Sequence, residues 1–317
     1  MKHESHHALR NTGGILAQTG NDAANNNQSR QESLAHRRLR YALRVIRRDP
    51  LALFSVFIIA LLIILALFGP WLAPYPEQGQ GRTNVPDRFL PPSAKYWLGA
   101  DQLGRDVLSR LIIGVRIALQ APAIVVLLAV MVGAPLGALA GYVGGWVDNL
   151  IMRVTDLFLA FPSLLLAVAI VAATGPSLTN AMIAIAISWW PWYTRLVRGV
   201  TISLRERYFV EAARSIGVPS GTIILRHILP NCVTPILVQA TIDFGTVILA
   251  EGSLAFLGLG TQPPLPDWGL MVSQGRLYIL DEWWISTFPG MAIFISVLAF
   301  NLLGDTLRDI LDPRQYR

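Results

Sequence analysis

Six long apolar segments, separated by polar stretches, dominate the pattern of this chain. They cover residues 51–68, 116–142, 154–173, 178–198, 231–256 and 284–304. Each is close to the roughly 20 residues that a helix needs to cross the hydrocarbon core of a bilayer. The pattern therefore predicts an all-α, polytopic membrane protein with six transmembrane helices.

The polar stretches divide the chain into parts. The first residues are rich in Asn, Gln, Ser, Gly and His, a composition typical of disordered segments. We expect, in order, a disordered tail, a basic segment with the first membrane helix, a polar loop, a core of five membrane helices and a short tail. These parts are predicted at 1–36, 37–73, 74–112, 113–310 and 311–317.

The composition argues against a soluble protein of this length. Hydrophobic residues make up 53% of the chain and charged residues 15%, against about 25% charged residues in a typical soluble domain. The single cysteine, Cys232, excludes an internal disulfide. The first apolar segment begins too far along and is too long for a cleaved signal peptide, so it should remain as an anchor.

The net charge of +6 comes almost entirely from arginine, since the lysines are Lys2 and Lys95. Arginines gather just before the first apolar segment, in the region 195–230 and in the C-terminal tail. Because they flank apolar segments, the positive-inside rule explains them better than a nucleic-acid partner does. We expect a multi-pass protein of a bacterial inner membrane, in contact with lipid, with both termini and the region 195–230 in the cytoplasm and the loop 74–112 in the periplasm.

The loop at 200–230 carries the most specific pattern. Its marked positions are Glu211, Ala212, Ala213, Gly217, Leu229 and Pro230. Small alanines allow a short helix to approach a partner groove closely, and a glycine permits a sharp turn. The alternative is an ordinary basic loop whose charge reflects topology alone, but that would not explain the order and spacing of these residues.

The pattern resembles the "EAA" cytoplasmic loop of permease subunits of ATP-binding-cassette importers. The form Arg226-His227-Ile228-Leu229-Pro230-Asn231 resembles the peptide and nickel branch of that family. Further stretches similar to that branch lie at 103–110, 140–146, 255–264 and 300–305. With about residues 37–317 covered, the chain resembles a C-type permease subunit of a dipeptide, oligopeptide or nickel importer.

The resemblance implies a type I importer permease fold and a function without covalent chemistry. The chain would form half of a translocation pathway for peptides, with nickel or glutathione as alternative substrates. The implied partners are a homologous second permease, one or two cytoplasmic ATPases coupled through the Glu211 loop, and a periplasmic substrate-binding protein. ATP and magnesium would belong to the ATPases, and no cofactor to this chain.

The sequence lacks the P-loop motif for ATP hydrolysis, and its one match to a zinc-binding motif does not indicate a metal site. Neither lysine is followed by serine or threonine, so the chain has no P-loop and needs an ATPase from elsewhere. Residues 3–7 read H-E-S-H-H, which fits the zinc motif H-E-x-x-H. A zinc hydrolase needs that motif on a helix with a third ligand, and here it lies in the polar tail, so no metal site is expected.

Asp243 and Glu251 fall inside the fifth apolar segment, where carboxylates are costly. They are separated by roughly 80° around a helix and could share one broad face. One interpretation is that they line the substrate path and attract a cationic amino terminus; the other is a structural pairing. A proton-coupled secondary transporter with either residue as a relay is a competing class, although it needs no ATPase-docking loop, and a membrane scaffold or receptor is a third.

The loop at 256–283 contains several prolines, Gln262 and Trp268. It is either a passive outer loop anchored by tryptophan at the membrane interface or an outer gate that meets a substrate-binding protein. The family resemblance favours the gate, with Gln262 and Trp268 as its candidate residues.

Overall fold

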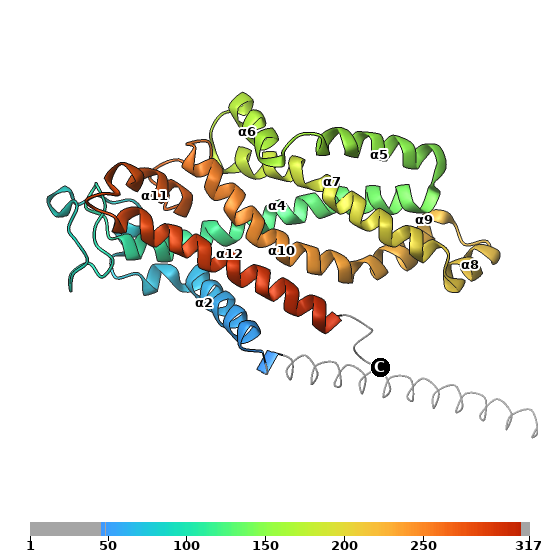
Figure 1. Cartoon of the computed structure of the whole chain (residues 1–317), viewed down its shortest axis with the longest axis horizontal. Helices are drawn as coiled ribbons and strands as arrows, with labels where there is room; N and C mark the ends of the chain where they lie inside the picture. Colours follow the sequence, from blue (N-terminus) through green and yellow to red (C-terminus); the bar gives the residue numbers. More distant parts are fainter. Residues whose placement is uncertain (1–45, 48, 312–317) are drawn as a thin grey trace, which may run out of the picture. The chain divides into compact units, whose positions relative to one another are not determined.

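The computed structural model describes residues 46–47 and 49–311, and within them the chain is built of helices joined by turns and loops (Figure 1). The predicted tail at 1–36, with the H-E-x-x-H motif, lies outside the described residues, as does the predicted tail at 311–317 except for Leu311, the last residue of α12. The chain divides after Leu53, and the bundle discussed below is the unit that begins at Phe54. The elements are α2 (Pro50–Leu72), α3 (Pro76–Gly79), η1 (Val85–Asp87), α4 (Val107–Val143), α5 (Gly145–Leu159), α6 (Ser163–Thr174), α7 (Leu178–Arg205), α8 (Tyr208–Ser215), α9 (Ser220–Ile223), η2 (Ile224–Ile228), α10 (Leu229–Phe256), α11 (Trp268–Gly275), η3 (Arg276–Tyr278) and α12 (Trp284–Leu311).

Among the described residues, four helices are long and apolar enough to cross a membrane by themselves. They are Pro50–Leu72, Val107–Val143, Ser220–Phe256 and Trp284–Leu311. The pair α5 and α6 is a candidate fifth span, bent by 82°. The predicted fourth segment corresponds to α7, which is long enough at 28 residues but is made more polar by the arginines of its second half. Length and composition alone therefore support fewer spans than the six expected.

The third predicted segment, 154–173, is divided between two helices rather than forming one continuous helix. α5 ends at Leu159 and α6 begins at Ser163, directly after Pro162. A proline disfavours helical backbone at the residue before it, so the helix ends ahead of Phe161. The turn predicted at Gly175-Pro176 is present, because α6 ends at Thr174 and α7 begins at Leu178.

A row of glycines lets α4 and α7 pack with their backbones close together. A Cβ added at Gly133 or Gly141 would lie 2.5 or 2.8 Å from a carbonyl oxygen of α7, and one at Gly137 would meet the Thr194 carbonyl oxygen more closely still. Small residues one turn apart are a common way to bring membrane helices into contact. This pair therefore forms the centre of the bundle.

Replacing Gly137 by leucine should prevent this packing. The side chain would be forced into the backbone of α7, and overpacking of this kind costs about 1–3 kcal/mol or more. We expect a large drop in the amount of assembled protein in the membrane, measured by immunoblot of membrane fractions. Gly199→Leu is the matched control, since a Cβ at Gly199 meets nothing within 4 Å. Equal amounts of the two variants would contradict the prediction.

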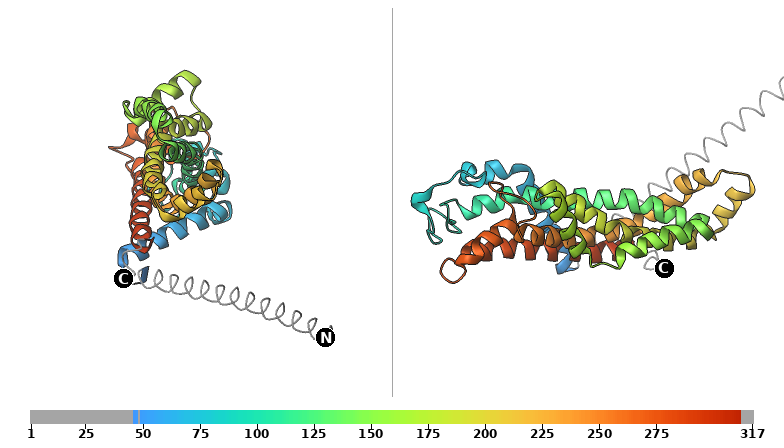
Figure 2. Two further views of the ribbon diagram at one scale, coloured as in Figure 1. Left: turned by 90° about the vertical axis from the view of Figure 1, so that its right-hand side faces the viewer. Right: turned by 90° about the horizontal axis from the view of Figure 1, so that it is seen from above.

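The two ends of the bundle are built differently. α8 and α9 lie at one end, with the end of α7 and the start of α10, whereas α11 lies at the other (Figure 1). The further views in Figure 2 agree with this placement. The loop between α2 and α4 lies at the same end as α11 and contacts the start of α12, where the indole of Trp284 donates to the carbonyl of Ala100 at 3.2 Å. We call these the α8 end and the α11 end.

Candidate functional site

The Glu211 loop folds as two short helices joined by a tight turn. α8 ends at Ser215, and Gly217 follows with φ +80°. The amides of Gly217 and Val218 donate to the carbonyls of Arg214 and Ala213. This is the common glycine ending of a helix, in which the left-handed backbone favours glycine. A Cβ here would meet nothing within 4 Å, so the backbone conformation rather than space explains the glycine.

α8 presents different residues to the bundle and to the outside. Val210 and Ala213 are buried in a cluster with Ile223 and Ile228, whereas Glu211 and Ala212 are exposed. Arg214 lies over the ring of Tyr142 on α4, 5.6 Å from its centre. The loop is thus seated on the bundle through one face and leaves the other face uncovered.

Three large apolar side chains project from this uncovered part of the loop. Tyr208 is 90% exposed, Ile216 is 80% exposed and Leu225 is 66% exposed. Large exposed apolar side chains within one short loop are candidates for an interaction surface. These three residues were not among those predicted from the sequence, although each lies within a few positions of one that was.

The chain passes from α9 into α10 through the π-helical turn η2, Ile224–Ile228. Leu229 begins α10 and Pro230 follows it. Proline has no N–H to donate to the carbonyl four residues earlier, and its ring collides with that carbonyl in a regular helix. A wider π-helical turn relieves this conflict, and such turns are frequent at functional sites. Leu229-Pro230 therefore marks a change of helix geometry within one continuous element, Ser220–Phe256.

Asp243 lies on the inner side of α10, against α7. Its side chain faces Tyr193, Trp189 and Gln239, and it is 7% exposed. The amide of Gln239 donates to Oδ1 at 3.1 Å. Oδ2 has no hydrogen-bond partner within the described part of the chain.

Glu251 is also buried, at 4% exposure, but its surroundings are those of α11. It faces Asp267, the residue that caps the start of α11 by accepting from the amide of Leu270 at 2.9 Å. Thr261 donates to the same aspartate at 3.4 Å. The rise along a helix separates Asp243 and Glu251 by about 12 Å, so the structure does not bring the two candidate pathway carboxyls together.

Burial raises the pKa of the Asp267 carboxyl above its usual range, with the donors at the start of α11 acting against this. A raised folded-state pKa contributes stability at low pH that is lost as the pH rises from about 4 through the raised value. We expect thermal unfolding of the solubilised protein to occur at lower temperature as the pH rises through this window. Asp267→Asn, which retains the cap, should flatten this dependence, whereas Asp281→Asn at an exposed position should not. An unchanged profile in Asp267→Asn would contradict the assignment.

The two candidate gate residues have different environments. Trp268 is 4% exposed, and its indole donates to the carbonyl of Leu111 on α4 at 3.1 Å. Gln262 is exposed, and its amide donates to the carbonyls of Gly258 and Gly260. Trp268 thus ties α11 to α4, so any movement of α11 has to include this contact.

A buried ionic cluster at the α11 end was not predicted. Asp101 accepts from Arg105 Nε and Arg110 Nη1, both at 2.7 Å, and all three residues are at most 1% exposed. Arg110 also donates to Gln274 of α11 at 3.5 Å. The cluster connects the polar loop, α4 and α11. The sequence showed the charges in 101–110 but gave no sign that they are buried.

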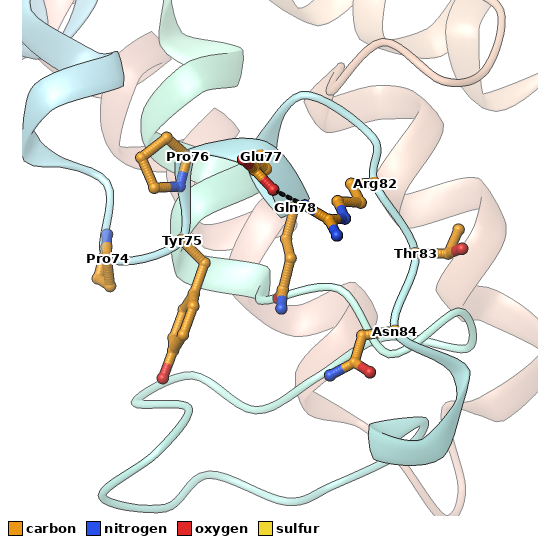
Figure 3. Close-up of a pocket in the computed structure, with 8 residues that line it drawn as sticks. All are labelled: Pro74, Tyr75, Pro76, Glu77, Gln78, Arg82, Thr83 and Asn84. Atoms are coloured by element: carbon orange, nitrogen blue, oxygen red, sulfur yellow. Dashed lines mark hydrogen bonds and ion pairs between the residues drawn. The ribbon is translucent and has the colours of Figure 1, made fainter.

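The same loop also forms a cavity of about 650 Å³ (Figure 3). Residues 74–78 and 82–84 form its wall, and among them Glu77 and Arg82 form an exposed ion pair. The cavity was not predicted, since the sequence indicates only a polar loop here.

Comparison with known proteins adds what the geometry alone does not give. The profile of the family described as binding-protein-dependent transport system inner membrane component matches residues 133–317. A second profile, the N-terminal TM domain of oligopeptide transport permease C, matches residues 38–92. The dipeptide transport system permease protein DppC of Alkalihalophilus pseudofirmus is 48% identical over 87% of this chain and 90% of its own length. The chain belongs to this family of transport-system inner membrane components.

Other relatives and solved structures agree. The probable D,D-dipeptide transport system permease protein DdpC of Escherichia coli is 44% identical over 85% of this chain and 90% of its own. The glutathione transport system permease protein GsiD of Escherichia coli is 46% identical over 86% and 89%. The inward-facing MetNI methionine ABC transporter matches with a TM-score of 0.52, covering 65% of this chain and 97% of that one at 19% identity, which shows the fold.

The predicted family and fold class are confirmed by these matches. The chain is an all-α, C-type permease subunit of the peptide importer family with the type I permease fold, and it is a multi-pass inner-membrane protein. It is a component of a transporter complex with ATPase and substrate-binding partners, and it is not itself the enzyme of that complex. Family membership therefore decides against the secondary transporter and the scaffold or receptor.

Proposed function

We propose that this chain forms half of an ATP-driven import pathway for short peptides, paired with a homologous second permease. The relatives described above are named for dipeptide, D,D-dipeptide and glutathione transport. Their substrates share a short peptide backbone. Among the alternatives left by the sequence, glutathione belongs to this same chemical class, and nickel does not.

The Glu211 loop is the observation that carries the proposal. It is seated on the bundle through Val210 and Ala213 and presents Glu211, Tyr208 and Ile216 to the outside. We assign this face to one or two cytoplasmic ATPases, which hold the ATP and magnesium. The α8 end, with the arginines of α7 and the Glu211 loop, then faces the cytoplasm together with both termini.

The same assignment places the α11 end on the periplasmic side, where a substrate-binding protein delivers the peptide. Gln262 and Trp268 are proposed to belong to an outer gate that moves with α11. Closure of the ATPases around ATP would displace the Glu211 loop, and the continuous element Ser220–Phe256 would carry this displacement into the bundle. ATP binding would thereby shift the transporter between two conformations, because its affinity for the nucleotide differs between them.

The proposal is tested with the complex produced from this permease, its second permease, its ATPases and its binding protein in proteoliposomes. We expect ATP-dependent uptake of radiolabelled alanylalanine, with competition by unlabelled dipeptides and none by nickel ions. Uptake of nickel without uptake of peptide would overturn the substrate class. Peptide uptake that persists without ATP, driven by a proton gradient, would overturn the energy source.

A further inference from the structure

A second cavity, of about 460 Å³, lies between α7, α10 and α12 toward the α8 end. Aliphatic side chains of α7 and α10 form most of its wall, and its polar members are Thr234, Gln239 and Arg308. The volume falls within the range of roughly 300–1,000 Å³ that is usual for small-molecule sites. The Glu211 loop contributes no residue to the wall of this cavity.

An incompletely paired carboxyl lies directly behind the cavity wall. Gln239, which lines the cavity, donates to Asp243 Oδ1 at 3.1 Å. Asp243 Oδ2 and the hydroxyl of Tyr193, which faces the same carboxyl, both lack a hydrogen-bond partner of good geometry within the described residues. The groups facing Asp243 carry no charge, and a buried carboxylate without a positive partner is unfavourable.

A positively charged side chain, that of Arg308, lies on the wall of the same cavity. Arg308 lies in the last turn of α12, is exposed and lines the cavity. Gly304 of α12 packs against Ile242, the neighbour of Asp243, since a Cβ added at Gly304 would lie 2.5 Å from Ile242 Cγ1. Arg308 lies four residues beyond Gly304 along α12, which corresponds to a rise of about 6 Å. The mainly aliphatic wall of the cavity therefore carries a cationic side chain, Arg308, and has a carboxyl, Asp243, directly behind the side chain of Gln239.

We infer that this cavity binds a short peptide in its zwitterionic form, with the ammonium at Asp243 and Tyr193 and the carboxylate at Arg308. An ammonium has three donors, so it can satisfy both unpaired oxygens and supply the missing positive charge. The flexible Gln239 side chain has to turn aside to admit it. The inference rests on the proposed function and adds a peptide site on the cytoplasmic half of the path, from which the substrate is released.

Thiol protection in the assembled transporter tests this site without relying on transport. Thr234→Cys places a thiol on the cavity wall, while the native Cys232 is fully buried and serves as the unreactive background. A charged maleimide should label the new thiol in inside-out membrane vesicles. Alanylalanine should slow the labelling, and N-acetyl-alanylalanine, which has no ammonium, should not.

Two double variants test which side chain binds each charged end of the dipeptide. Asp243→Asn and Arg308→Gln, each combined with Thr234→Cys, should raise the half-protecting concentration of alanylalanine about tenfold, as expected for loss of one charge-assisted hydrogen bond. Arg153→Gln is the matched control, since Arg153 is an exposed arginine of α5 that does not line the cavity. It should leave the protection unchanged.

The other outcomes are distinct. A thiol that is never labelled, or is labelled equally with and without dipeptide, overturns the site, even where uptake of dipeptide continues and the proposed function stands. Labelling that is blocked by phospholipid and restored only by delipidation would show that a lipid occupies the cavity. This result also overturns the peptide site. Protection by dipeptide in a transporter that fails to import peptides supports the site and contradicts the proposed function instead.

Discussion

Replacing Asp101 by alanine should remove most of the assembled protein from the membrane. Its two carboxylate oxygens accept from Arg105 Nε, Arg110 Nη1 and the backbone amides of Leu103 and Arg105, at 2.7 to 2.9 Å. Without this carboxylate, two buried guanidinium groups lose their shared anion. Breaking a buried ion pair from one side costs about 3–5 kcal/mol, a large part of the roughly 5–15 kcal/mol that stabilises a typical protein.

Two further variants separate the charge from the shape of Asp101. Asp101→Asn keeps an acceptor for the backbone amides and removes only the charge, so its loss should be smaller than that of Asp101→Ala. Asp281→Ala, at an exposed position near the same end of the bundle, should have no effect. The measurement is the quantity of protein in the membrane and its thermal unfolding after solubilisation. Wild-type values for Asp101→Ala would show that the cluster does not stabilise the fold.

The cluster also shows what sequence patterning could not supply. Apolar length located α2, α4, α10 and α12, because a bilayer demands a simple and continuous signal. Asp101, Arg105 and Arg110 stand in a polar stretch, which by itself indicates an exposed loop. Their burial depends on the fold of the loop over the start of α4 and against Gln274 of α11, a contact 164 residues away in the chain.

The structure differs from the sequence-based expectation in two further places. The cause is local at the helix break before Pro162 and long-range at Asp243 and Glu251. The break before Pro162 follows a local rule, but prolines are also tolerated inside membrane helices, as Pro122 and Pro135 of α4 are. The pattern of apolar residues does not distinguish a proline that ends a helix from one inside a continuous membrane helix. The helical-wheel argument placed Asp243 and Glu251 on one broad face, and both are buried. Their neighbours differ because α10 packs on α7 near one residue and on α11 near the other.

The Glu211 loop is the part of the candidate site that sequence described in most detail, since its turn is encoded locally. Gly217 takes the left-handed conformation that its position after a short helix predicts. The exposed side chains of Tyr208, Ile216 and Leu225 became visible only once the buried face of α8 was known. The assignment of the loop to ATPase coupling is a proposal that requires a functional test.

Gly217→Pro should abolish ATP-dependent uptake while leaving the protein folded in the membrane. Proline holds φ near −65° and has no N–H, whereas Gly217 has φ +80° and donates to the carbonyl of Arg214. The turn between α8 and α9 would be lost, but the surroundings of Gly217 are open, so the bundle should assemble. Gly221→Ala is the matched control, because Gly221 is equally unobstructed and has ordinary helical backbone.

Glu211→Lys tests the exposed face of α8 without altering the backbone. Glu211 is exposed, so reversing its charge should leave the bundle intact and act only on a partner seated there. Coupling free energies between sites commonly correspond to 5- to 150-fold effects, and we expect a reduction of about this size in uptake, with less ATPase co-purifying with the permease. Asp281→Lys, an exposed charge reversal at the α11 end, should retain both uptake and the ATPase. Normal uptake and normal ATPase recovery in both Glu211→Lys and Gly217→Pro would show that energy enters this permease somewhere other than the Glu211 loop.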